Sequence, residues 1–234
     1  MRLGKSVKLR KMPAMDAISE AVGRAAEMGA PIYYTLGSAG GTLSNAEQGP
    51  QTLASINIMG YAARMCAKSG VRLDVYSQIP DALPLIQETM QDSYTAEGKA
   101  DEYLPEQVTF INETAPYLTA SLGYMQREKP ASTMLIGGFY YESIVLGEAG
   151  NTIGALQIGG TANTHQMPFL AATCDYMLLS EELYAAAASI SNDAKTLGTL
   201  RGEDVMKLAF VAVLLIGLAL GATRIDWLVK LLKM

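Results

Sequence analysis

Glycine clusters follow several short apolar segments of this 234-residue sequence, and they are its clearest sign of a ligand site. Glycine lets backbone amides approach a bound molecule closely. Three clusters occur, at 37–41, 137–138 and 159–160. If the preceding segments are parallel strands, their carboxyl ends meet at one edge of a sheet, where such folds bind ligands. The candidate ligand-binding residues at this edge are Gly37, Ser38, Gly40, Gly41, Ser77, Asn112, Gly138, Glu142, Gly160, Thr161 and His165.

The cluster at 37–41, Gly-Ser-Ala-Gly-Gly, has two interpretations. It could cradle a phosphate through its backbone amides, but it matches neither G-x-G-x-x-G nor the Walker A loop, since no Lys-Ser/Thr follows. The next helix is expected near Pro50, so the loop is not coupled directly to a helix N-terminus. A flexible turn is therefore favoured over a phosphate cradle.

Two ionisable residues of the set could take part in chemistry. His165, the one histidine, could be a general acid or base, but the sequence places no carboxylate to orient it, and a hydrogen-bonded loop histidine is the simpler interpretation. Glu142 follows the pair Tyr140–Tyr141 directly after a strand, where it could contact a ligand or favour a helix N-terminus electrostatically. The sequence shows no Ser/His/Asp set and no metal-ligand spacing, so it predicts no catalytic residue and no metal site and leaves the cofactor unknown.

Composition restricts the remaining function classes. The net charge of -5 gives a nucleic-acid role no electrostatic support. Cys66 and Cys174 both fall in apolar patterns and are interpreted as buried small hydrophobes rather than a disulfide. The basic residues within 2–11 could bind anionic lipid headgroups or form a solvated terminus. No apolar run follows them, so no secretory signal is expected and the folded part is predicted to be cytoplasmic.

A repeated alternation of helix and strand patterns would position these candidates. Residues 15–28 are apolar at every third or fourth position and end at Gly29, and 31–36 form an apolar strand pattern. Right-handed crossovers between such strands give a mostly parallel sheet covered on both faces. We therefore predict an α/β, doubly wound (Rossmann-like) fold of about six strands. The strands are expected at 31–36, 71–76, 108–111, 134–136, 155–158 and 175–179.

A run of sixteen uncharged residues, 208–223, lies between Lys207 and Arg224. At about 1.5 Å per residue it spans roughly 24 Å, short of the ~30 Å hydrocarbon core, a gap that snorkelling of the flanking cations could close. A helix that is apolar on every face needs apolar surroundings, so a C-terminal transmembrane helix is predicted, with a buried helix in a large assembly as the alternative. Gly217 and Gly221 form a G-x-x-x-G pair that permits close helix–helix contact.

The predicted organisation has three parts: a basic arm at 1–14, an α/β domain at 15–200, and a single-pass membrane anchor with a short amphipathic tail at 201–234. This arrangement places the chain at the cell membrane with the α/β domain in the cytoplasm. The expected partners are the lipid bilayer and further copies of the chain or related subunits.

Several stretches together resemble one protein family. They are MPAMDAISEAVGRAAEMG at 12–29, the segments 128–161 and 168–188, and the closing hydrophobic helix. This set is similar to a family of uncharacterised prokaryotic, membrane-associated α/β proteins, the domain of unknown function 6754. The resemblance implies the overall layout and membrane association, and it supplies no reaction and no catalytic residues.

Two functions fit these observations. The first is a membrane-anchored, self-associating scaffold or assembly module without catalysis, based on the anchor, the glycine pair, the alanine-rich helix at 183–190 and the scarcity of catalytic side chains. The second is an enzyme or sensor that binds a nucleotide or other phosphorylated ligand at the glycine-rich edge of the sheet. The sequence favours the first.

Overall fold

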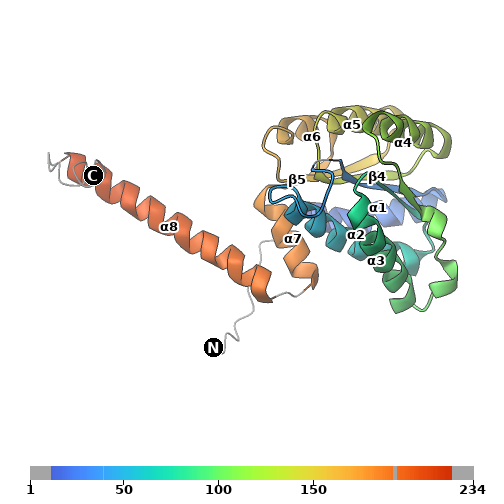
Figure 1. Cartoon of the computed structure of the whole chain (residues 1–234), viewed down its shortest axis with the longest axis horizontal. Helices are drawn as coiled ribbons and strands as arrows, with labels where there is room; N and C mark the ends of the chain where they lie inside the picture. Colours follow the sequence, from blue (N-terminus) through green and yellow to red (C-terminus); the bar gives the residue numbers. More distant parts are fainter. Residues whose placement is uncertain (1–11, 39, 192–193, 223–234) are drawn as a thin grey trace. The chain divides into compact units, whose positions relative to one another are not determined.

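The computed structural model describes residues 12–38, 40–191 and 194–222 (Figure 1). Contacts within the chain divide it into two units, Met1–Ser191 and Asn192–Met234, and each is described by itself. The basic residues at 2–11 and the tail from 223 onward fall outside the described residues.

A six-stranded parallel sheet forms the centre of the first unit, in the order β3-β2-β1-β4-β5-β6. The chain builds the sheet outward from β1 on one side and then from β4 on the other, so the winding reverses between these two strands. The predicted α/β fold with six parallel strands is therefore confirmed. The strands are β1 (Ile32–Gly37), β2 (Leu73–Ser77), β3 (Val108–Phe110), β4 (Ser132–Gly138), β5 (Leu156–Thr161) and β6 (Tyr176–Leu179).

Helices cover both faces of this sheet (Figure 1). One layer consists of α1 (Pro13–Met28), α2 (Gly49–Ser69), α3 (Leu83–Ala96) and α7 (Glu181–Ser191), and the other of α4 (Thr114–Glu128), α5 (Glu142–Ile153) and α6 (Met167–Thr173). Short 3-10 turns occur at Pro80–Ala82, Ala100–Glu102 and Pro105–Gln107. Because both faces are covered, β1, β2, β4 and β5 are buried along their whole length.

The two faces of the sheet have different cores. The face under α1, α2, α3 and α7 is packed mainly with aliphatic side chains and alanines. The face under α4, α5 and α6 is rich in tyrosine, and the rings of Tyr33, Tyr76 and Tyr124 lie 5.2–5.7 Å apart. Residues 71–76 alternate apolar and polar side chains, which is typical of a strand with one wetter face, but Asp74 in β2 is only 6% exposed. It is buried because it accepts hydrogen bonds from Tyr124 and Arg72.

The second unit contains α8 (Ala194–Ala222), a helix of 29 residues. No helix within the described residues is long and apolar enough to cross a membrane, so the predicted transmembrane helix is wrong. The uncharged run at 208–223 is shorter than the roughly 20 apolar residues that a spanning helix needs. The first part of α8 cannot extend the run, because it contains Lys195, Arg201, Glu203, Asp204 and Lys207.

Candidate functional site

The predicted ligand-binding residues lie at the carboxyl ends of the strands or in the loops and helix starts that follow them. Gly37, Ser77, Gly138 and Thr161 end β1, β2, β4 and β5, and Gly160 precedes Thr161. Their gathering at one edge follows from the parallel sheet, whereas their binding of a ligand stays a prediction.

The glycines at the β1–β4 boundary are required by the packing of the two strands. Gly37 has φ 79° and Gly137 has φ 145°, in a region that favours glycine. A Cβ atom at Gly37 would collide with the carbonyl of Gly138, and one at Gly137 with the carbonyl of Leu36. Similarly, a Cβ at Gly160 would lie 3.2 Å from the side chain of Ile136. Gly37 and Gly137 therefore permit a close approach between β1 and β4, whether or not a ligand binds there.

The loop after β1 is held by hydrogen bonds of its own. The side-chain oxygen of Asn45 accepts from the amides of Glu47 and Gln48, both at 3.0 Å, and its carbonyl accepts from the amide of Gly49 at 2.8 Å. Pro50 has no amide hydrogen to donate. The start of α2 therefore offers few free amides to a phosphate, because Asn45 already takes those that precede the helix.

The side chain of Asp81 fastens the same loop to the turn after β2. Its Oδ2 atom accepts from the hydroxyl of Thr42 at 2.6 Å and from the amide of Leu43 at 2.8 Å. The bond from Thr42 lowers the pKa of Asp81. This carboxylate therefore has a structural role in the loop.

Three buried amides form a clamp between α2 and the loop after β5. Gln48 and Gln51 both donate to the Oδ1 atom of Asn163, at 3.1 and 3.0 Å. Asn163 donates back to Gln48 and to the carbonyl of Phe139, and Gln51 accepts from the amide of Ala162. Sequence reasoning missed this clamp, since more than 110 residues separate Asn163 from the two glutamines and nothing local marks them.

Ser38 and Glu142 meet across the reversal point of the sheet. Ser38 directly follows β1, and Glu142 is the first residue of α5, after β4. The Ser38 hydroxyl donates a hydrogen bond to Oε1 of Glu142. Glu142 is 0% exposed, and its Oε2 atom has no hydrogen-bond partner among the described residues. A buried carboxylate oxygen without a donor is costly, so this atom is the unsatisfied point of the site.

Buried hydroxyl groups lie beneath this pair. Thr35 and Tyr117 share a hydrogen bond, and Thr35 also accepts from the amide of Gly37 at 3.1 Å. Burial raises the pKa of Tyr117 to about 12, and the charge of Glu142 also acts to raise it. Tyr117 is therefore a neutral phenol at physiological pH, and it lies within electrostatic range of the Glu142 carboxylate.

No hydrogen bond links the other predicted polar residues to Ser38 or Glu142 among the described residues. Ser77 and Thr161 each accept from the amide two residues further on, at 3.2 Å, and so stabilise turns. Asn112 and His165 are exposed, and the His165 ring stacks on Tyr140 with centroids 6.1 Å apart. Only Ser38 and Glu142 of the predicted set are joined to each other by a side-chain hydrogen bond among the described residues.

With this geometry defined, comparison with known proteins identifies the family. The model of the domain of unknown function DUF6754 matches residues 1–232. The chain belongs to this family. No curated protein and no solved structure matches the DUF6754 chain.

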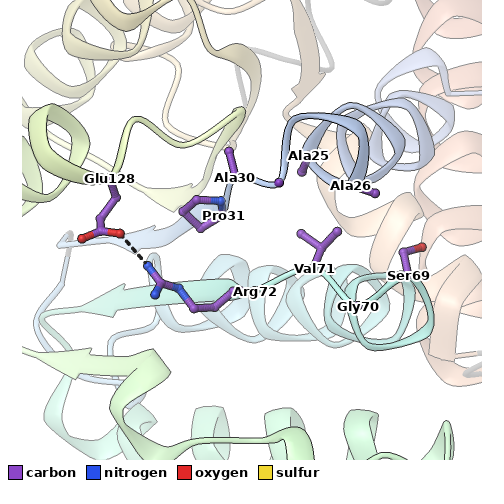
Figure 2. Close-up of a pocket in the computed structure, with 10 residues that line it drawn as sticks. Ala25, Ala26, Ala30, Pro31, Ser69, Gly70, Val71, Arg72 and Glu128 are labelled. Carbon is purple, nitrogen blue, oxygen red and sulfur yellow. Dashed lines mark hydrogen bonds and ion pairs between the residues drawn. The ribbon is translucent and has the colours of Figure 1, made fainter.

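A pocket of about 310 Å³ lies at the opposite, amino-terminal edge of the DUF6754 sheet (Figure 2). It is lined by the ends of α1 and α2 and by the residues that lead into β1 and β2. Figure 2 shows the ion pair between Arg72 and Glu128 at its side, 3.0 Å long. The helix ends are capped, because the amides after Gly29 and Gly70 return to carbonyls of the last turns. The polar groups that form these contacts already have partners.

Proposed function

We propose that the first unit is a small-molecule-binding module whose site lies between the carboxyl ends of β1 and β4. The observation that carries this proposal is the fully buried Glu142, which has one oxygen bonded to Ser38 and the other without a partner among the described residues. Open parallel sheets bind ligands where the strand order reverses, and this carboxylate stands at that place. A ligand that donates to Oε2 would supply the missing hydrogen bond.

Binding explains the Ser38–Glu142 pair better than catalysis does. A serine hydroxyl is a much weaker acid than a carboxylic acid, so the contact keeps the proton on Ser38. Nucleophilic serines are activated by a stronger base, usually histidine. His165 is exposed and stacks on Tyr140, and no hydrogen bond joins it to Ser38 among the described residues. The pair is therefore proposed to position a ligand.

The proposal is tested by filling the site. Ser38 is half-buried beside Glu142, so Ser38→Phe would place a ring there, whereas Ser44→Phe places the same ring at an exposed position of the same loop. A fragment library would be screened by ligand-observed NMR against the full chain and both variants. We expect to find fragments that bind the wild type and Ser44→Phe but do not bind Ser38→Phe. Fragments that bind all three equally, or no fragment at all, would contradict the proposal.

A second candidate function, self-association, is favoured by the surface of α8. The large apolar side chains described within 205–218 are more than half exposed, including Leu208 at 70%, Leu214 at 72% and Leu218 at 75%. A surface of this kind calls for an apolar partner, and a second copy of α8 offers the same surface in return. At Gly217 an added Cβ would meet no atom within 4 Å, which leaves room for a second helix. Gly221 lies one turn further along the helix.

Light scattering on the purified chain tests this second candidate. Leu214→Glu is expected to convert an oligomer into a monomer. Leu104→Glu, at a 55% exposed position of the first unit, serves as the matched control and is expected to leave the oligomer intact. A wild-type monomer, or equal effects of the two substitutions, would refute it.

A further inference from the structure

We infer that the group of the ligand that meets Glu142 is a positively charged amine and not a phosphate. This inference rests on the proposed function and adds to it the chemical class of the ligand. The buried, half-satisfied carboxylate supplies an acceptor and a negative charge at the same atom. An ammonium group supplies the matching donor and the opposite charge, and such charge-assisted hydrogen bonds are the stronger kind.

The distribution of charge in the first unit supports an amine. No lysine or arginine occurs in residues 38–63, 78–98, 111–126 or 130–191, which include every segment that follows a strand. All the basic residues of 12–191 lie late in helices or in the links toward the next strand. Acidic residues, in contrast, follow five of the six strands. They are Glu47, Asp81, Glu113, Glu142, Glu181 and Glu182.

A phosphate group would find neither of its usual partners here. Arginine and lysine side chains bind phosphate through charge, and the segments after the strands contain none. Helix N-termini bind it through free amides, but Asn45 accepts from the amides that precede α2. At the start of α5 the first residue is Glu142 itself, so a carboxylate already occupies the positive end of that helix dipole.

An organic cation fits the site better than a metal ion. Ca²⁺ takes six to eight oxygen ligands, and Mg²⁺ requires octahedral coordination. Within the described part of the chain no group of three His, Cys, Asp or Glu side chains could hold a metal. A single carboxylate oxygen and a hydroxyl suit one ammonium group.

The test compares two probes of the same length and different charge, 1,4-diaminobutane and 1,4-butanediol. Inorganic phosphate and magnesium chloride are further arms, all at equal ionic strength. Binding would be followed by calorimetry and by thermal unfolding of the full chain. Glu142→Gln keeps the shape and removes the charge, and Glu148→Gln makes the same change at an exposed position of the same helix.

We expect the diamine to bind the wild type and Glu148→Gln, and to bind Glu142→Gln about 30-fold more weakly or worse, as for loss of one partner of a buried charge pair. Should Glu142→Gln fail to fold, the wild type's preference for the diamine over the diol tests the inference by itself, and equal binding of the two probes would overturn it.

Four results would overturn the inference: equal binding of the diol, preference for phosphate, preference for magnesium, or diamine binding that Glu142→Gln leaves unchanged. If the diamine fails to bind while fragments still distinguish Ser38→Phe from Ser44→Phe, the amine inference is wrong and the proposed binding site survives. If neither the diamine nor any fragment binds, both proposals are wrong.

Discussion

Two buried carboxylates, one near each edge of the sheet, differ in the number of hydrogen-bond donors that they receive. At the amino-terminal edge, Asp74 is buried but accepts from Arg72 at 2.8 Å and from the hydroxyl of Tyr124. At the carboxyl-terminal edge, Glu142 is fully buried and receives one donor, Ser38. Residues 130–191 contain no lysine or arginine that could neutralise it from within the second half of the sheet. The fold therefore gives one buried acid two donors and gives the other a single donor, at the edge where open parallel sheets generally bind ligands.

The largest change in unfolding free energy is expected at the amino-terminal edge of the sheet, where Asp74 has its donors. Asp74→Ala removes the acceptor of both the Arg72 guanidinium and the buried Tyr124 hydroxyl, so the unfolding free energy should fall by about 3 kcal/mol. Because the Arg72 side chain is half exposed, the expected loss of unfolding free energy is at the lower end of the range for a broken buried ion pair. Glu128→Gln removes only the exposed partner and should cost less than about 1 kcal/mol. Urea unfolding of both variants measures this, and equal losses would show that Asp74 is not the centre of the network.

A smaller change in unfolding free energy is expected from the ionisation of Tyr117 at high pH. Burial raises the pKa of Tyr117 to about 12 in the folded chain, from an ordinary value of 10.0. A raised folded-state pKa means that the stabilisation is complete below pH 10 and is lost as the pH rises from 10 toward 12. Tyr117→Phe cannot ionise, so its unfolding free energy should fall less steeply over that window, by up to about 2–3 kcal/mol. Parallel slopes for the variant and the wild type would contradict the assigned burial of the phenol.

The sheet itself was predictable because strands covered on both faces appear in the sequence as continuous apolar runs. Each predicted strand overlaps an observed one, and β1 at Ile32–Gly37 differs from the prediction by one residue at each end. The burial of Asp74 could not be predicted, because alternation looks the same whether the polar side chain meets water or a buried partner. The uncharged run at 208–223 indicated lipid through its composition, while its length fell short of a span.

Single residues of the candidate site could be predicted from the sequence, but the contact between them could not. Glu142 could be singled out because it follows a strand and opens a helix, where a carboxylate can act on a ligand or on the helix dipole. Its contact with Ser38 could not, since 104 residues separate the two and their meeting depends on β1 lying beside β4. The sequence did not reveal that Gly37 and Gly137 also serve close approach between β1 and β4, because that contact depends on the pairing of the two strands.

The most direct test of the account is the unfolding free energy of Glu142→Gln without any ligand. Glutamine can still accept from Ser38, and it replaces an unpaired buried charge by a neutral amide. Removing that charge should outweigh the lost helix-dipole interaction of roughly 0.3–1 kcal/mol, so the variant should be more stable than the wild type by about 1 kcal/mol. Glu148→Gln should be nearly neutral. A Glu142→Gln protein that is destabilised as strongly as Asp74→Ala would show that the fold already satisfies this carboxylate and holds no place for a ligand there.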